Sequence, residues 1–138
     1  MKVLVDTSVW SLALKKADKN ESELGIVELL AELIRDTTVI LIGPIRQEIL
    51  SGISVKTKFD ELRSKLAIFK DQPLVSKDYE LAAEYCNVCR ANGIQGAHID
   101  FLICAFSINN NYPILTLDKD FQFYKKYLPI KTIKMESV

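Results

Sequence analysis

Short, uninterrupted apolar runs alternate along this chain with longer segments that have helical spacing. Residues 3–5, 39–42 and 114–117 are β-branched or apolar almost throughout, as in strands that are buried on both faces of a parallel sheet. Between the first two runs, residues 21–35 carry apolar side chains three and four positions apart, which is typical of an amphipathic helix. Strands that alternate with helices predict an α/β domain with a mainly parallel sheet.

The remaining elements are predicted from the same spacings. We expect further helices near residues 44–50, 59–69, 81–89, 98–108 and 121–127, a short strand near 74–75 and an edge strand near Ile130. The chain has 138 residues and no repeat or Pro/Gly/Ser-rich linker. We therefore predict that residues 1–138 form one domain, which is an ordinary domain size.

Composition excludes several classes of protein. Lys plus Arg and Asp plus Glu both number 18, so the formal net charge is +0, which argues against a globally basic nucleic-acid-coating protein. We see no signal peptide, and no apolar run approaches the ~18 residues of a membrane span. The odd number of cysteines, three, is typical of reduced thiols. We expect a cytoplasmic protein without a membrane partner.

Two acids directly follow predicted strands. Asp6 ends the first apolar run, and Asp118 follows residues 114–117, with Asp120 two positions on. Ligand sites in open parallel sheets lie beyond the carboxyl ends of the strands, so these acids are candidates for a functional site. Asp is also common as a helix cap or turn residue, and each of the three could have that role instead.

Two further acids interrupt apolar helix faces. Asp100 is the one charged residue of the stretch 96–112, and burying a lone carboxylate is costly unless a cation or several donors compensate. A role at the helix N-terminus is the alternative for Asp100. Glu48 shares helical spacing with Ile45 and Ile49, which predicts an inward position, whereas a place at the edge of that stripe would leave Glu48 in water.

Carboxylates that converge on one pocket repel one another, and their pKa values rise unless a positive charge enters. Hard divalent cations prefer such oxygen ligands. No Cys and His cluster with zinc spacing is present, since Cys86 and Cys89 have no second pair and His98 is the single histidine. An acid-only pocket therefore favours Mg²⁺ or Mn²⁺ and hydrolysis of a phosphodiester by metal-activated water.

Two other functions remain open at this point. The first is a phosphatase that uses Asp6 as nucleophile; such enzymes carry a second Asp two positions on, where this chain has Ser8, and no Lys partner is evident. The second is a non-catalytic protein-binding module, in which the acids are only caps. This second function predicts no binding of divalent ions.

The acids and their neighbours resemble those of the PIN domain, above all in VapC-like ribonuclease toxins of prokaryotic toxin–antitoxin pairs. The resemblance covers almost the whole chain. It is carried by four motifs in order, which are VLVDTSVW around Asp6, GPIRQE ending at Glu48, IDFLICA around Asp100 and TLDKDF around Asp118.

The resemblance implies a three-layer α/β/α domain with a central, mainly parallel sheet of about five strands, and Mg²⁺- or Mn²⁺-dependent endonucleolytic cleavage of RNA. It also implies a homodimer and a cognate, VapB-like antitoxin as partner. By position, Asp6, Asp100, Glu48 and Asp118 would be the catalytic acids and metal ligands. Thr7 and Thr116 would orient Asp6 and Asp118, with Asp120 as a supporting or substitute acid.

Basic residues suggest where an RNA strand could run. Lys15 and Lys16 follow the first predicted helix, and Arg46 precedes Glu48. We assign these three a substrate-binding role, because cations along a nuclease pocket hold phosphates. A second basic group lies near the C-terminus, at Lys125, Lys126, Lys131 and Lys134.

Overall fold

The computed structural model describes residues 1–133, so Lys134 lies outside the described residues. Helices and strands alternate along the chain, as the apolar runs predict. Their bounds are β1 (Val3–Val5), α1 (Thr7–Leu14), α2 (Glu21–Arg35), β2 (Val39–Ile42), α3 (Gly43–Ser51), α4 (Lys56–Leu66), β3 (Asp71–Gln72), α5 (Ser76–Ala91), α6 (His98–Asn110), β4 (Ile114–Leu115) and α7 (Asp120–Tyr124).

The described strands form one parallel sheet at the centre of the molecule. Its order is β3-β2-β1-β4, and every pair of neighbours is parallel. The three residues of β1 are fully buried, because helices cover both faces of the sheet. The α/β class with a central parallel sheet is therefore confirmed, with four strands where about five were expected.

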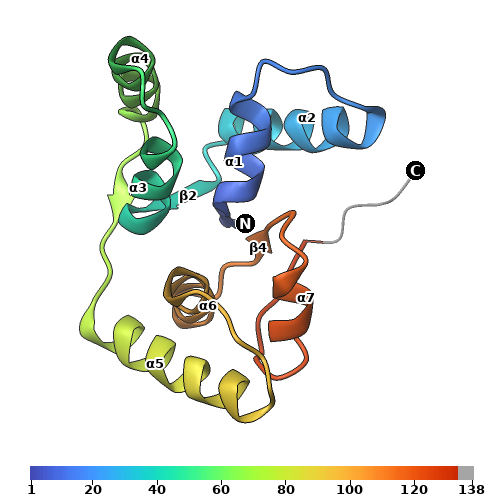
Figure 1. Ribbon diagram of the computed structural model, residues 1–138, viewed down its shortest axis with the longest axis vertical. Coiled ribbons are helices and arrows are strands. Elements are labelled where there is room, and N and C mark those ends of the chain that lie inside the picture. Colours follow the sequence, from blue (N-terminus) through green and yellow to red (C-terminus); the bar gives the residue numbers. More distant parts are fainter. Residues whose placement is uncertain (134–138) are drawn as a thin grey trace.

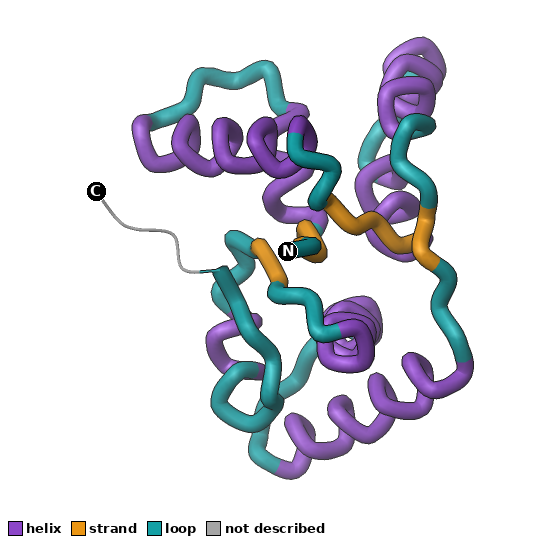
Figure 2. Tube along the Cα trace, turned by 180° about the vertical axis from the view of Figure 1, so that it is seen from behind, coloured by secondary structure: helices purple, strands orange, loops and turns teal. Residues whose placement is uncertain are grey.

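The strand order also explains the layers. The chain steps from β1 to β2 to β3 in one direction and then returns to place β4 on the other side of β1. Because parallel crossovers are right-handed, a reversal of direction moves the connecting helices to the opposite face. Accordingly, α1 to α4 lie on one side of the sheet and α5 and α6 on the other (Figures 1 and 2).

Three predicted elements differ from the structure. The strand expected near residues 74–75 is instead Asp71–Gln72, because Val75 begins helix α5 and its N–H donates to Asp78 Oδ2 at 2.9 Å. The edge strand expected near Ile130 is reduced to a single parallel bridge between Ile114 and Thr132. The helix expected over residues 59–69 spans Lys56–Leu66.

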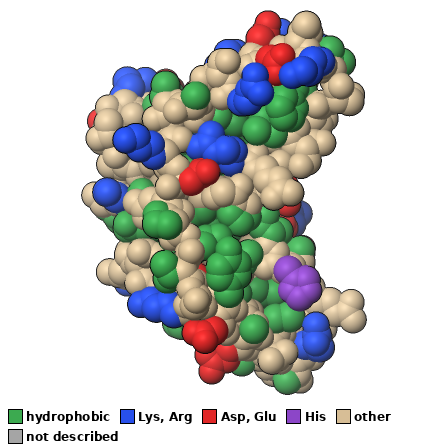
Figure 3. Space-filling model, turned by 90° about the vertical axis from the view of Figure 1, so that its left-hand side faces the viewer, with side chains coloured by type: hydrophobic (Ala, Val, Ile, Leu, Met, Phe, Trp, Pro, Cys, Tyr) green, Lys and Arg blue, Asp and Glu red, His purple; other side chains and the backbone are tan. Residues whose placement is uncertain are grey.

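Apolar side chains from both helix layers pack on the sheet. Phe101, Phe106, Phe121 and Tyr124 are among the largest side chains that are fully buried. Seen from the side, the molecule is hollowed between the part that carries α4 and the part that carries α5 (Figure 3). Among the described helices, none has the length and apolar character that a membrane crossing requires.

Arg46 of α3, for which the sequence predicts a role in substrate binding, holds neighbouring elements together. Its Nε donates to Asp71 Oδ1 at 2.9 Å, and its Nη1 donates to the carbonyl oxygen of Leu66 at 3.0 Å. Its Nη2 donates to the carbonyl of Phe69. The guanidinium thus joins α3 to the end of α4 and to β3, with one hydrogen bond from each of its three nitrogens.

Replacing Arg46 with Ala is therefore expected to destabilise the protein. Loss of the ion pair and of two carbonyl partners should lower the free energy of unfolding by about 1–2 kcal/mol, measured by urea denaturation. Arg63→Ala is the matched control, since Arg63 is exposed and pairs with the exposed Asp60, at 3.2 Å; its effect should stay within about 0.5 kcal/mol. Equal effects of the two substitutions would contradict the structural role of Arg46.

Candidate functional site

Acids gather where the direction of the sheet reverses. Strands β1 and β4 are neighbours, with Val5 opposite Leu115, and their carboxyl ends lead into Asp6 and Asp118. The helices that follow β1 and precede β4 lie on opposite faces of the sheet (Figure 1). Such a switch point leaves a crevice between diverging connections, which is where open α/β sheets bind ligands.

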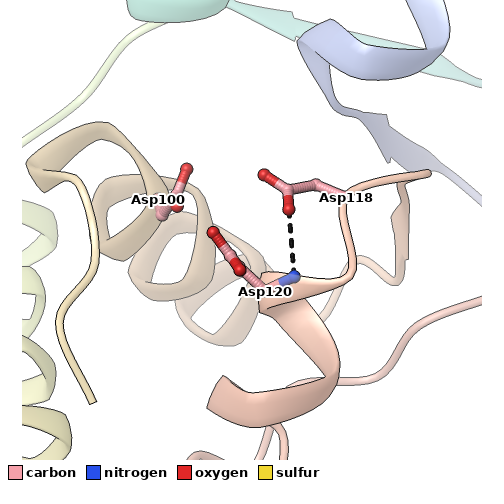
Figure 4. Close-up of side chains that lie close together, drawn as sticks. All are labelled: Asp100, Asp118 and Asp120. Atoms are coloured by element: carbon pink, nitrogen blue, oxygen red, sulfur yellow. Dashed lines mark hydrogen bonds between the residues drawn. The ribbon is translucent and has the colours of Figure 1, made fainter.

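Three carboxylates come closest together at this edge. Asp100 lies in the first turn of α6, Asp118 in the loop after β4, and Asp120 at the first residue of α7. One oxygen from each lies within 4.8 Å of the others, and the side chains point toward one another (Figure 4). The backbone N–H of Asp120 donates to Asp118 Oδ1 at 2.9 Å, which fixes the loop that brings these two acids to Asp100.

The electrostatic environment of Asp100 shows that more acids face the same point. The pKa of Asp100 is raised from an ordinary 3.8 to about 6. Burial is the largest cause, a hydrogen bond from Tyr124 opposes the rise, and the charges of Asp118, Asp6 and Glu48 add to it in that order. Three of the acids singled out in the sequence therefore act on the carboxyl group of a fourth. A cation bound among them would relieve this repulsion.

The Asp6 side chain is held by hydroxyl groups and not by a helix-capping bond. It precedes α1, but it accepts no capping hydrogen bond from a backbone N–H of that helix. Instead the side-chain hydroxyls of Ser8, within α1, and of Thr116 each donate to Asp6 Oδ2 at 2.7 Å. Asp6 is only 5% exposed. Since both of these bonds go to Oδ2, the other oxygen stays available to a ligand.

The structure corrects the role predicted for Thr7. The Thr7 hydroxyl is buried and has no hydrogen-bond partner among the described residues, while Ser8, one position on, bonds Asp6. Ser8 Oγ also accepts the N–H of Leu117 at 2.9 Å, which joins the ends of β1 and β4. Thr116 bonds Asp6 as described, and it fixes Asp118 through the backbone, by accepting the Asp118 N–H at 3.0 Å.

Tyr124 is a positioning residue that the sequence pattern did not reveal. Its hydroxyl donates to Asp100 Oδ2 at 2.7 Å, and its ring is fully buried against Phe101 and Phe121. Gly96 permits this approach, because a Cβ at that position would lie 2.5 Å from the Tyr124 hydroxyl. Burial and the Asp100 carboxylate raise the pKa of Tyr124, so the phenol remains a hydrogen-bond donor.

Glu48 and the lysines lie farther out than the sequence suggested. Ile45 and Ile49 are buried in α3, but Glu48 is exposed, which corrects its predicted place on the inward face: it lies at the edge of the apolar stripe. Its charge still reaches Asp100. Lys15 and Lys16 are exposed beyond the C-terminal end of α1, about 12 Å along that helix from the Asp6 end.

The donor set fits a hard divalent ion. It consists of carboxylate oxygens with hydroxyl donors behind them, without His or Cys among its members. Oxygen-only sites with several carboxylates favour Mg²⁺, Mn²⁺ or Ca²⁺ over zinc. Asp100, Asp118 and Asp120 would hold such an ion together with Asp6, and Glu48 is a further acid whose charge reaches Asp100.

The raised pKa of Asp100 predicts how stability depends on pH in chelator. Between the ordinary pKa of 3.8 and the folded value of about 6, the folded state binds more protons than the unfolded state, so the free energy of unfolding falls as pH rises. Asp100→Asn removes this titration. At pH 7.5 the variant should be more stable than the wild type by up to about 3 kcal/mol.

Urea denaturation at pH 4 and 7.5 checks this expectation, since the gain should shrink toward pH 4. Asp36→Asn, a change at an exposed acid at the end of α2, serves as control and should alter stability little at either pH. A loss of stability in Asp100→Asn at pH 7.5 would mean that the carboxylate is compensated within the fold.

A second prediction isolates the Tyr124 hydroxyl. Tyr124→Phe keeps the ring and removes the donor that lowers the pKa of Asp100, so the Asp100 midpoint should move above about 6. Carboxyl carbon shifts followed by NMR against pH, in chelator, measure it directly. Tyr112→Phe is the control, because the Tyr112 hydroxyl lies 3.5 Å from Gln72 and bonds no acid. An unchanged midpoint in Tyr124→Phe would remove Tyr124 from the site.

Three solved structures with this fold are similar to the chain over nearly its whole length. FitAcB from Neisseria gonorrhoeae matches with a TM-score of 0.75 and 22% identity, over 96% of each chain. VapBC2 from Rickettsia felis, bound to a DNA fragment from its promoter, matches with a TM-score of 0.77 and 16% identity, over 99% of this chain and 100% of that one. FitAB bound to the IR36 DNA fragment matches with a TM-score of 0.75 and 20% identity, over 98% of each chain.

Sequence comparison gives the family. No curated protein matches the sequence. The model of the PIN domain, however, matches residues 3–127, a stretch that runs from the start of β1 to beyond α7 and includes every acid of the site. The chain therefore belongs to the PIN domain family.

Proposed function

We propose that this protein is a Mg²⁺- or Mn²⁺-dependent endoribonuclease that acts as the toxin of a toxin–antitoxin pair. The observation that carries the proposal is the approach of Asp100, Asp118 and Asp120 to within 4.8 Å of one another, beside the buried Asp6. Family membership supports nuclease activity, because PIN domains are in general nucleases. Metal dependence and the choice of RNA are the proposed parts.

Each residue of the site has a distinct task in this proposal. Asp6 and Asp100 bind the metal ion, each held through one carboxylate oxygen by hydroxyl donors. Asp118 completes the pocket. Asp120 lies beside it and contributes a carboxylate oxygen to the same cluster. Glu48, exposed across the crevice, orients water at the open side. When bound, the ion supplies a lowered pKa for that water and neutralises charge on the phosphoryl oxygens.

The two alternative functions account for less of the site. A phosphatase with Asp6 as nucleophile needs a second acid two positions on, and Ser8 stands there with its hydroxyl on Asp6 Oδ2. A non-catalytic module would use the acids as caps, but the Asp6 side chain makes no capping hydrogen bond to α1, and burial of Asp100 among other acids has no benefit for a binding module. Hydrolysis with a bound cation explains both features.

The proposed partners follow from the family resemblance and the solved neighbours. VapBC2 and FitAB are each named as two-component assemblies and are described as bound to DNA. We propose a VapB-like antitoxin for this chain, and a homodimer. We also propose that residues 1–138 are one domain and that the protein works in the cytoplasm, where its cysteines, free in the structure, would stay reduced.

Cleavage of RNA tests the proposal. The purified protein should cut RNA with Mg²⁺ or Mn²⁺, and chelator should stop the reaction. Asp100→Asn should lower the rate at least about a hundredfold, because the ion loses a ligand at the centre of the pocket. Product formation on gels, with RNA and DNA of the same sequence side by side, also tests the choice of nucleic acid.

Controls separate catalysis from folding. Asp36→Asn removes a negative charge from an exposed site on α2 and should cut as fast as the wild type. Circular dichroism should show that both variants are folded. Full activity of Asp100→Asn refutes the assignment. Absence of both cleavage and Mg²⁺ or Mn²⁺ binding in the wild type, measured by calorimetry, would instead favour the non-catalytic module.

A further inference from the structure

An exposed aromatic side chain lies beside the acids and takes no part in holding them. Phe123 is 49% exposed, although two other aromatic residues of α7, Phe121 and Tyr124, are fully buried. It follows Asp120 by three positions, and residues with this spacing share one face of a helix with Cβ atoms about 5–6 Å apart. The Phe123 ring is therefore a neighbour of the acidic cluster on the surface of α7.

Buried side chains fix the orientation of helix α7, which carries this ring. Tyr124, the next residue, is fully buried and bonds Asp100 at 2.7 Å, and Phe121 is buried as well. Because two side chains of α7 are held in the core, the helix cannot roll to hide Phe123. An apolar ring that the fold keeps at the surface is open to a ligand without a rearrangement of the helix that carries it.

A cation and a second aromatic residue extend the same surface. Lys126 Nζ lies 5.3 Å from the centroid of the Phe123 ring. Tyr127 is 43% exposed, and the turn of α7 continues to it, because the Tyr127 N–H donates to the carbonyl of Tyr124 at 3.0 Å. Lys125, by contrast, donates to Thr132 at 3.0 Å. We call Phe123, Lys126 and Tyr127 the α7 platform.

The chemistry of the α7 platform matches an unpaired nucleotide. Aromatic rings stack on exposed bases, and neighbouring cations bind the phosphates between them. A strand within a duplex cannot offer the faces of its bases in this way. The positive charge of Lys126 lies next to a pocket of negative charge, so a polyanion whose phosphate enters that pocket with a cation gains a second attachment outside it.

We infer that the α7 platform binds a base of single-stranded RNA next to the phosphodiester that is cut. The inference rests on the proposed nuclease function and adds to it a base-binding surface outside the acidic pocket. Phe123 provides the stacking surface, Lys126 binds the adjoining phosphate, and Tyr127 extends the surface by one turn. A protein partner on the same residues is the competing occupant, and the experiment distinguishes it.

Binding and cleavage are measured separately. Fluorescence anisotropy follows a labelled 12-nucleotide single-stranded RNA, and the same strand in a blunt duplex, with the full chain carrying Asp100→Asn and Mg²⁺ present. In that background, Phe123→Ala should weaken single-strand binding about tenfold and leave duplex binding nearly unchanged, because base stacking on an aromatic ring is lost.

Further variants identify the interaction. Phe123→Trp should retain affinity, whereas Phe123→Leu, which is apolar without a ring, should weaken binding as Ala does. Lys126→Gln should reduce the slope of affinity against salt by about one phosphate contact. Tyr79→Ala, at an aromatic residue of α5 that is 52% exposed, is the control and should bind as the parent does. Unfolding midpoints verify that each variant is folded.

Each outcome decides the question. Unchanged single-strand affinity in Phe123→Ala overturns the inference and leaves the nuclease proposal intact, provided the wild type cuts RNA. Retained affinity in Phe123→Leu overturns stacking. Dissociation of a dimer by Phe123→Ala in sedimentation, with RNA affinity unchanged, assigns the surface to a protein partner. A wild type that neither cuts nor binds RNA contradicts the proposed function itself, and the inference with it.

Discussion

The cost of keeping the Asp100 carboxyl group partly buried among other acids is the constraint around which this molecule is organised. Burial and the charges of its neighbours raise the pKa of Asp100 to about 6. In the absence of a cation, the ionised Asp100 therefore lowers the free energy of unfolding at neutral pH. Packing elsewhere must compensate for this cost. The fully buried β1 and the rings of Phe101, Phe121 and Tyr124 surround the acids with the structure that does so.

Hydroxyl groups make the arrangement specific. Asp6 accepts from Ser8 and Thr116, and Asp100 accepts from Tyr124, each at 2.7 Å. These donors fix the orientation of a carboxylate without adding a positive charge that would compete with a cation. A lysine or arginine in the same place would lower the repulsion and also occupy the site. Arg46, which is close in sequence to Glu48, instead binds Asp71 and two carbonyl groups.

The sequence reveals those features that depend on chain order, and it misses those that depend on side-chain direction. Strand ends at Asp6 and Asp118 and the isolated charge of Asp100 could be predicted, because apolar runs define parallel strands and their carboxyl edge. The direction in which a hydroxyl points within one helical turn could not be predicted. The sequence therefore assigns the hydrogen bond to Asp6 to Thr7, whereas the structure assigns it to Ser8. Glu48 illustrates the same limit. Whether a side chain at the edge of an apolar stripe is buried or exposed depends on which residues, far away in sequence, pack beside it.

Tyr124 had a signal that spacing alone does not convey. A tyrosine in an apolar helix face must bury its hydroxyl, and a buried hydroxyl needs a partner; the nearest unsatisfied acceptors are the acids of the site. Gly96 is the counterpart of that contact, because any side chain there would meet the Tyr124 hydroxyl at 2.5 Å. Close approach of the α6 entry loop to α7 therefore depends on a residue without a Cβ, and the position of Asp100 relative to Asp120 depends on that approach.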